Sequence, residues 1–281
     1  MELLKEDIKF LSKDECKGPF VRLNGVGNTN DAGRYVSHQG RIGPMMETLA
    51  KNAGRIHNQE DFYNIWINEV IPELIKNNPK YNNSIDYIYD LIMEFKNRCN
   101  TKEIDDLELY KYFLFLAIHA TYFGNEVEEK FAELVNLTGK FIVMHSNAYE
   151  DSNLGIDLIH LDPTTKNPLF LIQVKPDTFI NNNNKDSGII PTRRNYFYEI
   201  SKAEKQYGVP VYFVFYKKIG KNYDPNEIEW FVNYNAKDKN YPSIHCFTLD
   251  ELCRRNGYMI GANALWNKEN AHHYSQKELV F

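Results

Sequence analysis

The chain has 281 residues, a formal net charge of −5 at pH 7, and 43% hydrophobic and 14% aromatic residues. This length accommodates one large or two modest domains with a packed core. The start of the chain, MELLKEDIKFLSKDE, lacks the apolar stretch of a signal peptide. The longest membrane-like run, residues 112–118, is too short to span a bilayer. We therefore expect a soluble, cytoplasmic protein.

The cysteines argue against a zinc site or a disulfide framework, because they lie far apart and form no CxxC pair. They are Cys16, Cys99, Cys246 and Cys253. We expect all of them to be reduced thiols. The negative net charge does not favour a nucleic-acid binder, so the local distribution of basic residues matters more than the sum.

Residues 24–55 form an unusual polar segment, rich in Gly, Asn, Arg, His and Gln. The segment lacks the Gly-Lys-Ser/Thr of a phosphate-binding P-loop, so it does not indicate nucleotide binding. Arg and Asn or Gln are the side chains that contact guanine and adenine edges in pairs of hydrogen bonds. Two interpretations remain open: recognition of DNA bases or phosphates by Arg34, Gln39 and Arg41, or a structural loop.

The following part of the N-terminal region has helical periodicity. Helices are predicted over residues 61–77, 84–98 and 104–122, with Pro72 bending the first. In the second helix one side is apolar, formed by Ile85, Ile88, Leu91, Ile92 and Phe95. We expect residues 1–120 to be a mainly helical region with a possible role in DNA recognition.

From residue 121 onwards, helices and strands alternate. A helix is predicted over residues 124–138, and strands over 141–145, 155–161, 169–175, 209–216 and 227–234. In the helix, Val127, Phe131, Leu134 and Val135 form an apolar stripe, and Glu128 lies at the edge of that stripe. This pattern predicts an α/β fold with a central mixed β-sheet flanked by helices over residues 121–281.

The stretch LGIDLIHLDPTTKNPLFLIQVKP, residues 154–176, carries the most specific signal. A hairpin centred on Thr165 would pair Leu161 with Leu169, Ile159 with Leu171, Asp157 with Gln173 and Gly155 with Lys175. Alternate residues of a strand share a face, so one face would gather an acid, an amide and an amine. The strand of Gln173 is otherwise apolar, as expected for a strand buried on both faces, so two polar residues there need a reason.

This residue set has the chemistry for phosphodiester hydrolysis. The reaction needs an activated water and a cation beside the phosphate, and a carboxylate-bound divalent metal supplies both. Mg²⁺ prefers oxygen ligands and keeps several waters, so Asp157 and Gln173 would suffice as protein ligands. Lys175 would place positive charge where the transition state is most anionic.

A helix that carries Glu128 is followed by a strand, by a second strand with Gly-Ile-Asp157, by a third with Gln173-x-Lys175, and then by a helix and a strand. Over roughly residues 122–218, this order resembles the core of the PD-(D/E)XK nuclease superfamily. The resemblance implies that Asp157 and Gln173 bind Mg²⁺, that Lys175 assists the attacking water, and that Glu128 joins through the metal shell. Ile156 stands where the family name has Pro. Gln173 replaces an acid and removes a negative charge from the metal site, which makes Glu128 more necessary.

The basic residues that follow the Gln-x-Lys strand are candidates for phosphate contacts. They include Arg193, Arg194 and Lys202, for which a solvated helix face is the alternative. Within the superfamily the chain resembles a type II restriction endonuclease, with a likeness to the MjaI-like group, which implies a homodimer that cuts double-stranded DNA at a short site. The alternatives are another nuclease of this fold in repair or recombination, and a catalytically silent DNA-binding protein.

Overall fold

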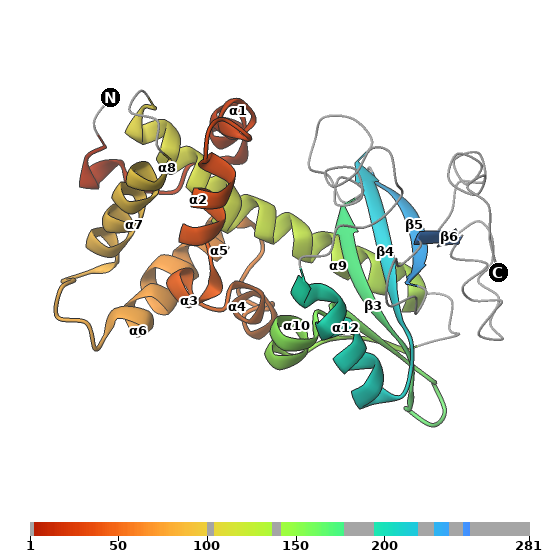
Figure 1. Ribbon diagram of the computed structural model, residues 1–281. Coiled ribbons are helices and arrows are strands. Elements are labelled where there is room, and N and C mark those ends of the chain that lie inside the picture. Colours follow the sequence, from red (N-terminus) through yellow and green to blue (C-terminus); the bar gives the residue numbers. More distant parts are fainter. Residues whose placement is uncertain are drawn as a thin grey trace. The chain divides into compact units, whose positions relative to one another are not determined.

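The computed structural model describes residues 3–99, 104–136, 142–176, 194–218, 228–235 and 244–247 (Figure 1). The chain divides into two units, residues 1–125 and residues 126–281. The division lies inside helix α9 (Thr121–Asn136), whereas the sequence placed it near residue 120. Each unit is described separately below.

The first part of the N-terminal unit is a series of short helices. They are η1 (Lys5–Asp7), α1 (Lys13–Leu23), α2 (Thr29–Val36), α3 (Gln39–Ile42) and α4 (Met45–Lys51). The polar segment 24–55 is therefore largely helical. The segment has few buried apolar side chains, among them Val36, Ile42 and Met45. These side chains pack its helices against the core of the unit.

The predicted helix over residues 61–77 is interrupted by a π-helical turn. It forms as α5 (Gln59–Ile65), η2 (Trp66–Val70) and α6 (Ile71–Ile75). The wider turn ends two residues before Pro72, which cannot donate a backbone hydrogen bond and crowds the preceding turn. Trp66 is fully buried in that turn, and its indole N–H donates to the carbonyl of Ile42 at 2.9 Å.

Two long helical segments carry most of the unit's largest fully buried side chains. Helix α7 (Ser84–Arg98) has the predicted bounds and is capped by Asn83, whose side chain accepts from the Asp86 amide. The second segment runs without a break through α8 (Asp106–Leu114), η3 (Phe115–Ala120) and α9. The sequence suggested two helices here, but Gly124 continues the helix, since a single glycine costs only about 1 kcal/mol in a helix interior.

The C-terminal unit contains a mixed sheet in the strand order β1-β2-β3-β4-β5-β6. The strands are β1 (Ile142–His145), β2 (Leu158–Leu161), β3 (Pro168–Pro176), β4 (Val211–Lys218), β5 (Ile228–Asn235) and β6 (Ile244–Phe247). β3 and β4 are parallel, and every other neighbouring pair is antiparallel. The mixed α/β class expected from the sequence is confirmed.

The β2–β3 hairpin has the predicted register over part of its length. Ile159 pairs with Leu171 as expected, but Leu161 pairs with Pro168 because the register shifts after His160. The predicted pairing of Leu161 with Leu169 is therefore wrong. Lys166, with φ 61°, lies in the left-handed region in the turn, and the shift next to that turn accommodates an extra residue. The shift lies at the turn end of the hairpin, away from Asp157.

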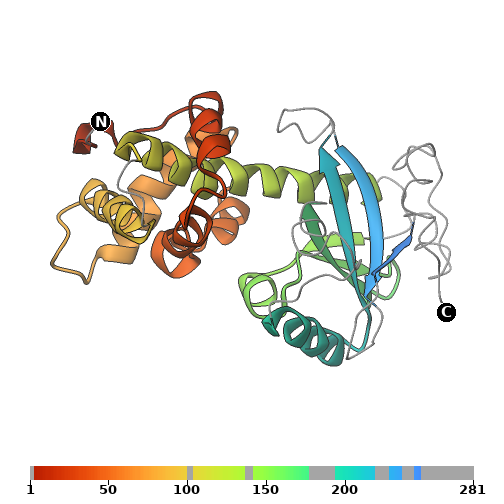
Figure 2. The ribbon, with the colours of Figure 1, turned by 45° about the horizontal axis from the view of Figure 1, so that its top comes forward.

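Helices cover the sheet on both sides (Figures 1 and 2). α12 (Arg194–Tyr207) lies in front of the sheet in Figure 1 and packs beside α10 (Ala148–Leu154), while α9 passes behind it. Phe131 of α9 contacts the ring of the buried His160 at a centroid distance of 6.1 Å. Among the described residues no helix is both long and apolar enough to cross a membrane.

Candidate active site

Asp157 is fixed by the backbone at the junction between α10 and β2. Gly155 ends α10 in the left-handed conformation, with φ 61°, and turns the chain into the strand. The Asp157 amide donates to the Ile172 carbonyl at 2.9 Å, and its own carbonyl accepts from Ser146 at 3.0 Å. Its carboxylate oxygen Oδ2 accepts a hydrogen bond of 2.6 Å from the Val174 amide. The side chain, 6% exposed, is therefore anchored to β3.

Lys175 reaches the same carboxylate. Its Nζ lies 3.5 Å from Asp157 Oδ2. The Lys175 side chain is 24% exposed, so the ammonium borders solvent while the carboxylate does not. Two residues of the predicted set, one on each side of the hairpin, are thus in contact.

Gln173 lies two residues before Lys175 on β3 and is only 2% exposed. Its amide oxygen Oε1 is buried and accepts no hydrogen bond from any residue that the structure describes. A buried polar atom without a partner costs roughly 1–3 kcal/mol, so such atoms are few in folded proteins. An oxygen ligand held ready for a cation accounts for this arrangement.

Glu128, on α9, interacts electrostatically with Asp157 and Lys175. Burial raises the pKa of its carboxyl well above the usual value, and the negative charge of Asp157 raises it further, while Lys175 acts in the opposite direction. The pKa of Glu128 thus responds to the charges of both hairpin residues. The four residues singled out in the sequence, Glu128, Asp157, Gln173 and Lys175, therefore belong to one region of the C-terminal unit.

Asp151 is a member of this region that the sequence reasoning missed. It lies on α10, and burial together with the charge of Asp157 raises the pKa of its carboxyl to about 6, partly offset by Lys175. The sequence does contain a signal for its helix. Asn147 and Glu150 form a capping box, in which each side chain bonds to the other's backbone N–H.

α10 is held in place by α12. The hydroxyl of Tyr207, near the end of α12, donates to the Glu150 carboxylate. Burial and the negative charge of Glu150 raise the pKa of Tyr207 to about 12, so the hydroxyl stays protonated and remains a donor. This contact connects the helix that carries Asp151 to the helix that follows the Gln-x-Lys strand.

The donor set fits a divalent cation. Among the described residues no three His, Cys, Asp or Glu side chains converge closely enough to hold a metal by themselves. The Asp157 carboxylate and the unpartnered Gln173 oxygen nevertheless provide two oxygen ligands, and Mg²⁺ takes its remaining ligands from water. Burial, and then the negative charge of Asp157, raises the pKa values of Glu128 and Asp151, and a cation beside these acids would offset that repulsion.

The predicted DNA-binding residues lie in different environments. Arg34 is exposed on α2, and Lys202 is exposed on α12, with its Nζ 5.4 Å from the centre of the Tyr149 ring. Arg41 is half-buried and forms an ion pair with Glu94. Arg193 and the side chains of Gln39 and Arg194 lie outside the described residues.

No protein-family model, curated protein or solved structure matches this chain. A proposal of function therefore rests on the geometry and chemistry of the chain's own residues.

Proposed function

We propose that this protein is a Mg²⁺-dependent endonuclease with a PD-(D/E)XK-type core, which hydrolyses phosphodiester bonds in double-stranded DNA at a short specific sequence, as type II restriction endonucleases do. The observation that carries the proposal is the unpartnered, buried oxygen of Gln173 beside the Asp157–Lys175 pair. Burying the Gln173 oxygen without a partner is costly, and a bound cation would offset that cost.

The order of elements supports the same core. A helix that carries Glu128 precedes a three-stranded antiparallel unit, and α12 then leads to β4, which pairs in parallel with β3. The acid lies immediately before the second strand and the Gln-x-Lys pair on the third. The sequence resemblance was based on this order with Asp157 on a strand over residues 155–161, whereas the strand begins at Leu158 and α10 lies between β1 and β2.

Each residue has a role in the proposed reaction. Asp157 and Gln173 would hold the cation directly, and Glu128 would complete its surroundings. The bound cation would supply positive charge to the phosphate and lower the pKa of a water. Lys175, at the solvent border of the site, can leave Asp157 for a phosphate oxygen and place its charge where negative charge develops.

A plasmid assay tests the proposal. We expect the full chain to cut supercoiled plasmid in the presence of Mg²⁺ and to be inactive in EDTA. Digestion of a mixed-sequence genome should give discrete fragments, since a restriction enzyme cuts only at defined sites. A continuous smear would favour a nuclease of repair or recombination. Binding without any cutting in Mg²⁺ or Mn²⁺ would favour a silent DNA-binding protein.

The proposal includes a homodimer, because cutting both strands of a short symmetric site calls for two copies of the site. Sedimentation of the chain with a cleavable duplex in Ca²⁺, an ion of the same charge, should show two chains per duplex. A single chain per duplex would contradict the homodimer without affecting the metal site.

A further inference from the structure

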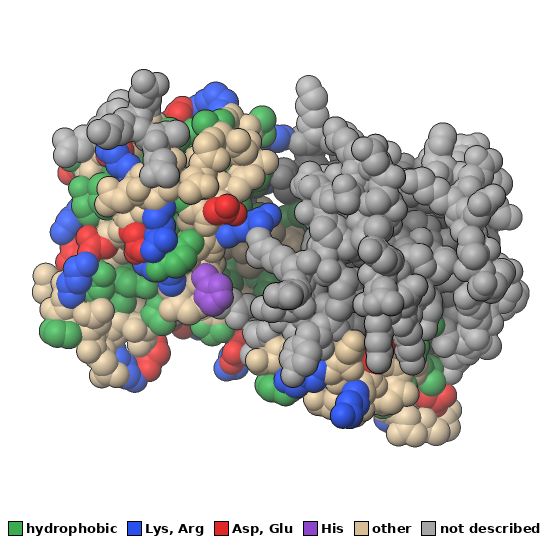
Figure 3. Space-filling model, viewed as in Figure 1, with side chains coloured by type: hydrophobic (Ala, Val, Ile, Leu, Met, Phe, Trp, Pro, Cys, Tyr) green, Lys and Arg blue, Asp and Glu red, His purple; other side chains and the backbone are tan. Residues whose placement is uncertain are grey.

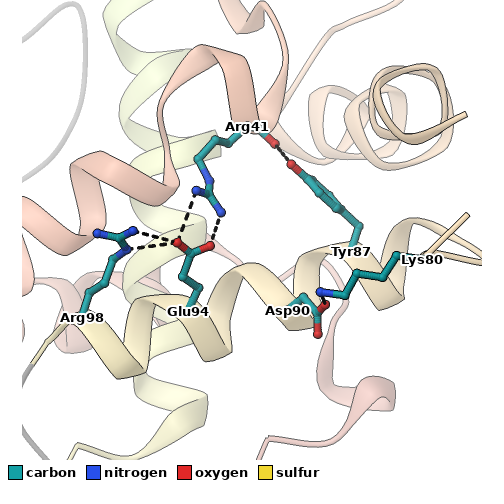
Figure 4. Close-up of polar contacts among 6 residues, drawn as sticks. All are labelled: Arg41, Lys80, Tyr87, Asp90, Glu94 and Arg98. Carbon is teal, nitrogen blue, oxygen red and sulfur yellow. Dashed lines mark hydrogen bonds and ion pairs between the residues drawn. The ribbon is translucent and has the colours of Figure 1, made fainter. Parts of the chain in front are cut away.

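Two arginines of the N-terminal unit share one carboxylate. Arg41 contacts Glu94 through both terminal nitrogens, one of them at 3.4 Å, and Arg98 contacts Glu94 through Nε at 3.1 Å and Nη2 at 3.0 Å (Figure 4). Burial would raise the pKa of Glu94, but the two guanidinium groups outweigh it and hold the pKa below its usual value. One ionised carboxylate therefore faces two fixed positive charges.

Tyr35 orients both guanidinium groups. The Cζ atoms of Arg98 and Arg41 lie 3.4 Å and 4.5 Å from the centre of the Tyr35 ring. The Tyr35 residue is 40% exposed and the Arg98 side chain 43%, so this stacked group reaches the surface. Guanidinium groups fixed in this way lose less conformational entropy when they bind an anion.

Arg34 adds a third positive charge at the same end of α7. Arg34 is exposed and directly precedes Tyr35, whose ring contacts Arg98 at the last residue of α7. The exposed Asp31 also lies on α2, so the surroundings of Arg34 are not purely basic.

This concentration of arginine is local. Acidic and basic side chains are interspersed over the face of the N-terminal unit seen in Figure 3, and the unit presents no continuous basic surface in that view. Elsewhere on α7 the acids are matched one to one. Asp90 pairs with Lys80 (Figure 4), and Asp86 pairs with Lys5.

We propose that Arg34, Tyr35, Arg41 and Arg98, here called the arginine cluster, bind the phosphate backbone of double-stranded DNA, and that Glu94 takes the place of one phosphate in the free protein. The inference rests on the proposed function for the identity of the polyanion. Guanidinium groups bind phosphate and carboxylate through the same paired geometry. Because Glu94 already engages the Arg41 donors that a base would need, the cluster contacts phosphates and contributes affinity without reading sequence.

The test is the affinity of the full chain for a fluorescent duplex in EDTA, measured by anisotropy over a range of salt concentrations. Arg34→Glu and Arg98→Glu should each weaken binding by about tenfold or more and reduce the salt slope by about one phosphate contact. The losses should be equal on duplexes of unrelated sequence. Glu94→Gln should tighten binding several-fold, since it frees two guanidinium groups.

Lys76→Glu is the matched control, because it makes the same charge change at an exposed residue that pairs only locally with Glu73. An equal loss in this control would overturn the inference by showing a general charge effect. A Glu94→Gln variant that melts at a lower temperature but binds DNA like the wild type would also overturn it, since Glu94 would then be purely structural. Wild-type binding by Arg34→Glu and Arg98→Glu in a chain that still cuts DNA would refute the cluster and leave the proposed function standing. A chain that neither binds nor cuts DNA would refute both.

Discussion

The Lys175 ammonium lies 3.5 Å from Oδ2 of Asp157, the oxygen that also accepts a 2.6 Å hydrogen bond from the neighbouring Val174 amide. The amide contact is short and fixed by the strand, whereas 3.5 Å is at the outer limit of a hydrogen bond. The carboxylate is therefore held by the backbone and not by the lysine. Lys175 can be redirected to a phosphate without displacing Asp157.

Asp157→Asn should abolish Mg²⁺-dependent cleavage with little loss of stability. The amide oxygen can still accept from Val174, but the ligand charge is lost. Asp157→Ala is the less informative change, because it would leave the buried Val174 N–H without an acceptor at a cost of roughly 1–3 kcal/mol. The measurements are plasmid cleavage and thermal unfolding of the same preparation. Cleavage by Asp157→Asn at the wild-type rate would refute the site.

Gln173→Met should stabilise the metal-free protein while it removes activity. The substitution keeps a similar length and replaces the buried amide, whose oxygen has no partner among the described residues, by an apolar group. We expect unfolding in EDTA to require about 1 kcal/mol more than in the wild type. A lower stability in EDTA would mean that the amide makes a stabilising contact and is not held open for a cation.

Gln173→Glu should have the opposite effect on the stability of the metal-free protein. A further carboxylate beside Asp157, Glu128 and Asp151 adds repulsion in EDTA, so the metal-free variant should melt at a lower temperature than the wild type. Added Mg²⁺ should raise its melting temperature by more than it raises that of the wild type, because the new ligand is charged. Equal responses of the two proteins to Mg²⁺ would show that residue 173 is not a ligand.

Lys175→Ala should lose turnover but retain DNA binding in EDTA. Lys175 is the basic group that contacts the proposed metal ligand, while phosphate contacts elsewhere carry the affinity. Lys166→Ala, an exposed change in the β2–β3 turn, is the matched control and should behave like the wild type. Wild-type cleavage by Lys175→Ala in saturating Mg²⁺ would make the lysine an ordinary strand residue.

The sequence predicted those parts of the fold in which apolar periodicity and strand alternation are strong. The bounds of α7 and the pairing of Ile159 with Leu171 are examples. It could not show the register shift after His160, because the shift depends on the backbone of the turn. Nor did periodicity indicate that segment 24–55 is mostly helical, since its few buried residues are separated by Gly and Asn.

The candidate site was only partly visible from the sequence. Alternation placed Gln173 and Lys175 on one face, and the hairpin brought Asp157 to them. Asp151 went unnoticed because its proximity to Asp157 depends on how α10 enters β2, which no local pattern reports. The sharing of Glu94 by Arg41 and Arg98 is likewise a tertiary contact between residues far apart in the chain.

His160→Phe should make the protein less sensitive to acid. His160 is 2% exposed and stacks on Phe170 with ring centres 4.3 Å apart, and burial lowers the pKa of its imidazole from 6.5 to about 3. Because the folded-state pKa is lowered, the neutral ring contributes its full stability above pH 6.5, and that stability is lost as the pH falls toward 3. Between pH 7 and pH 5 the wild type should lose about 2 kcal/mol from this residue.

Denaturant unfolding at the two pH values checks the prediction, since Phe has a similar shape and cannot be protonated. The variant should keep some sensitivity, because burial also lowers the pKa of His119, to about 4. The residual loss in His160→Phe should therefore be smaller than the wild-type loss by about 2 kcal/mol. Identical losses in the two proteins would mean that folding does not lower the pKa of His160.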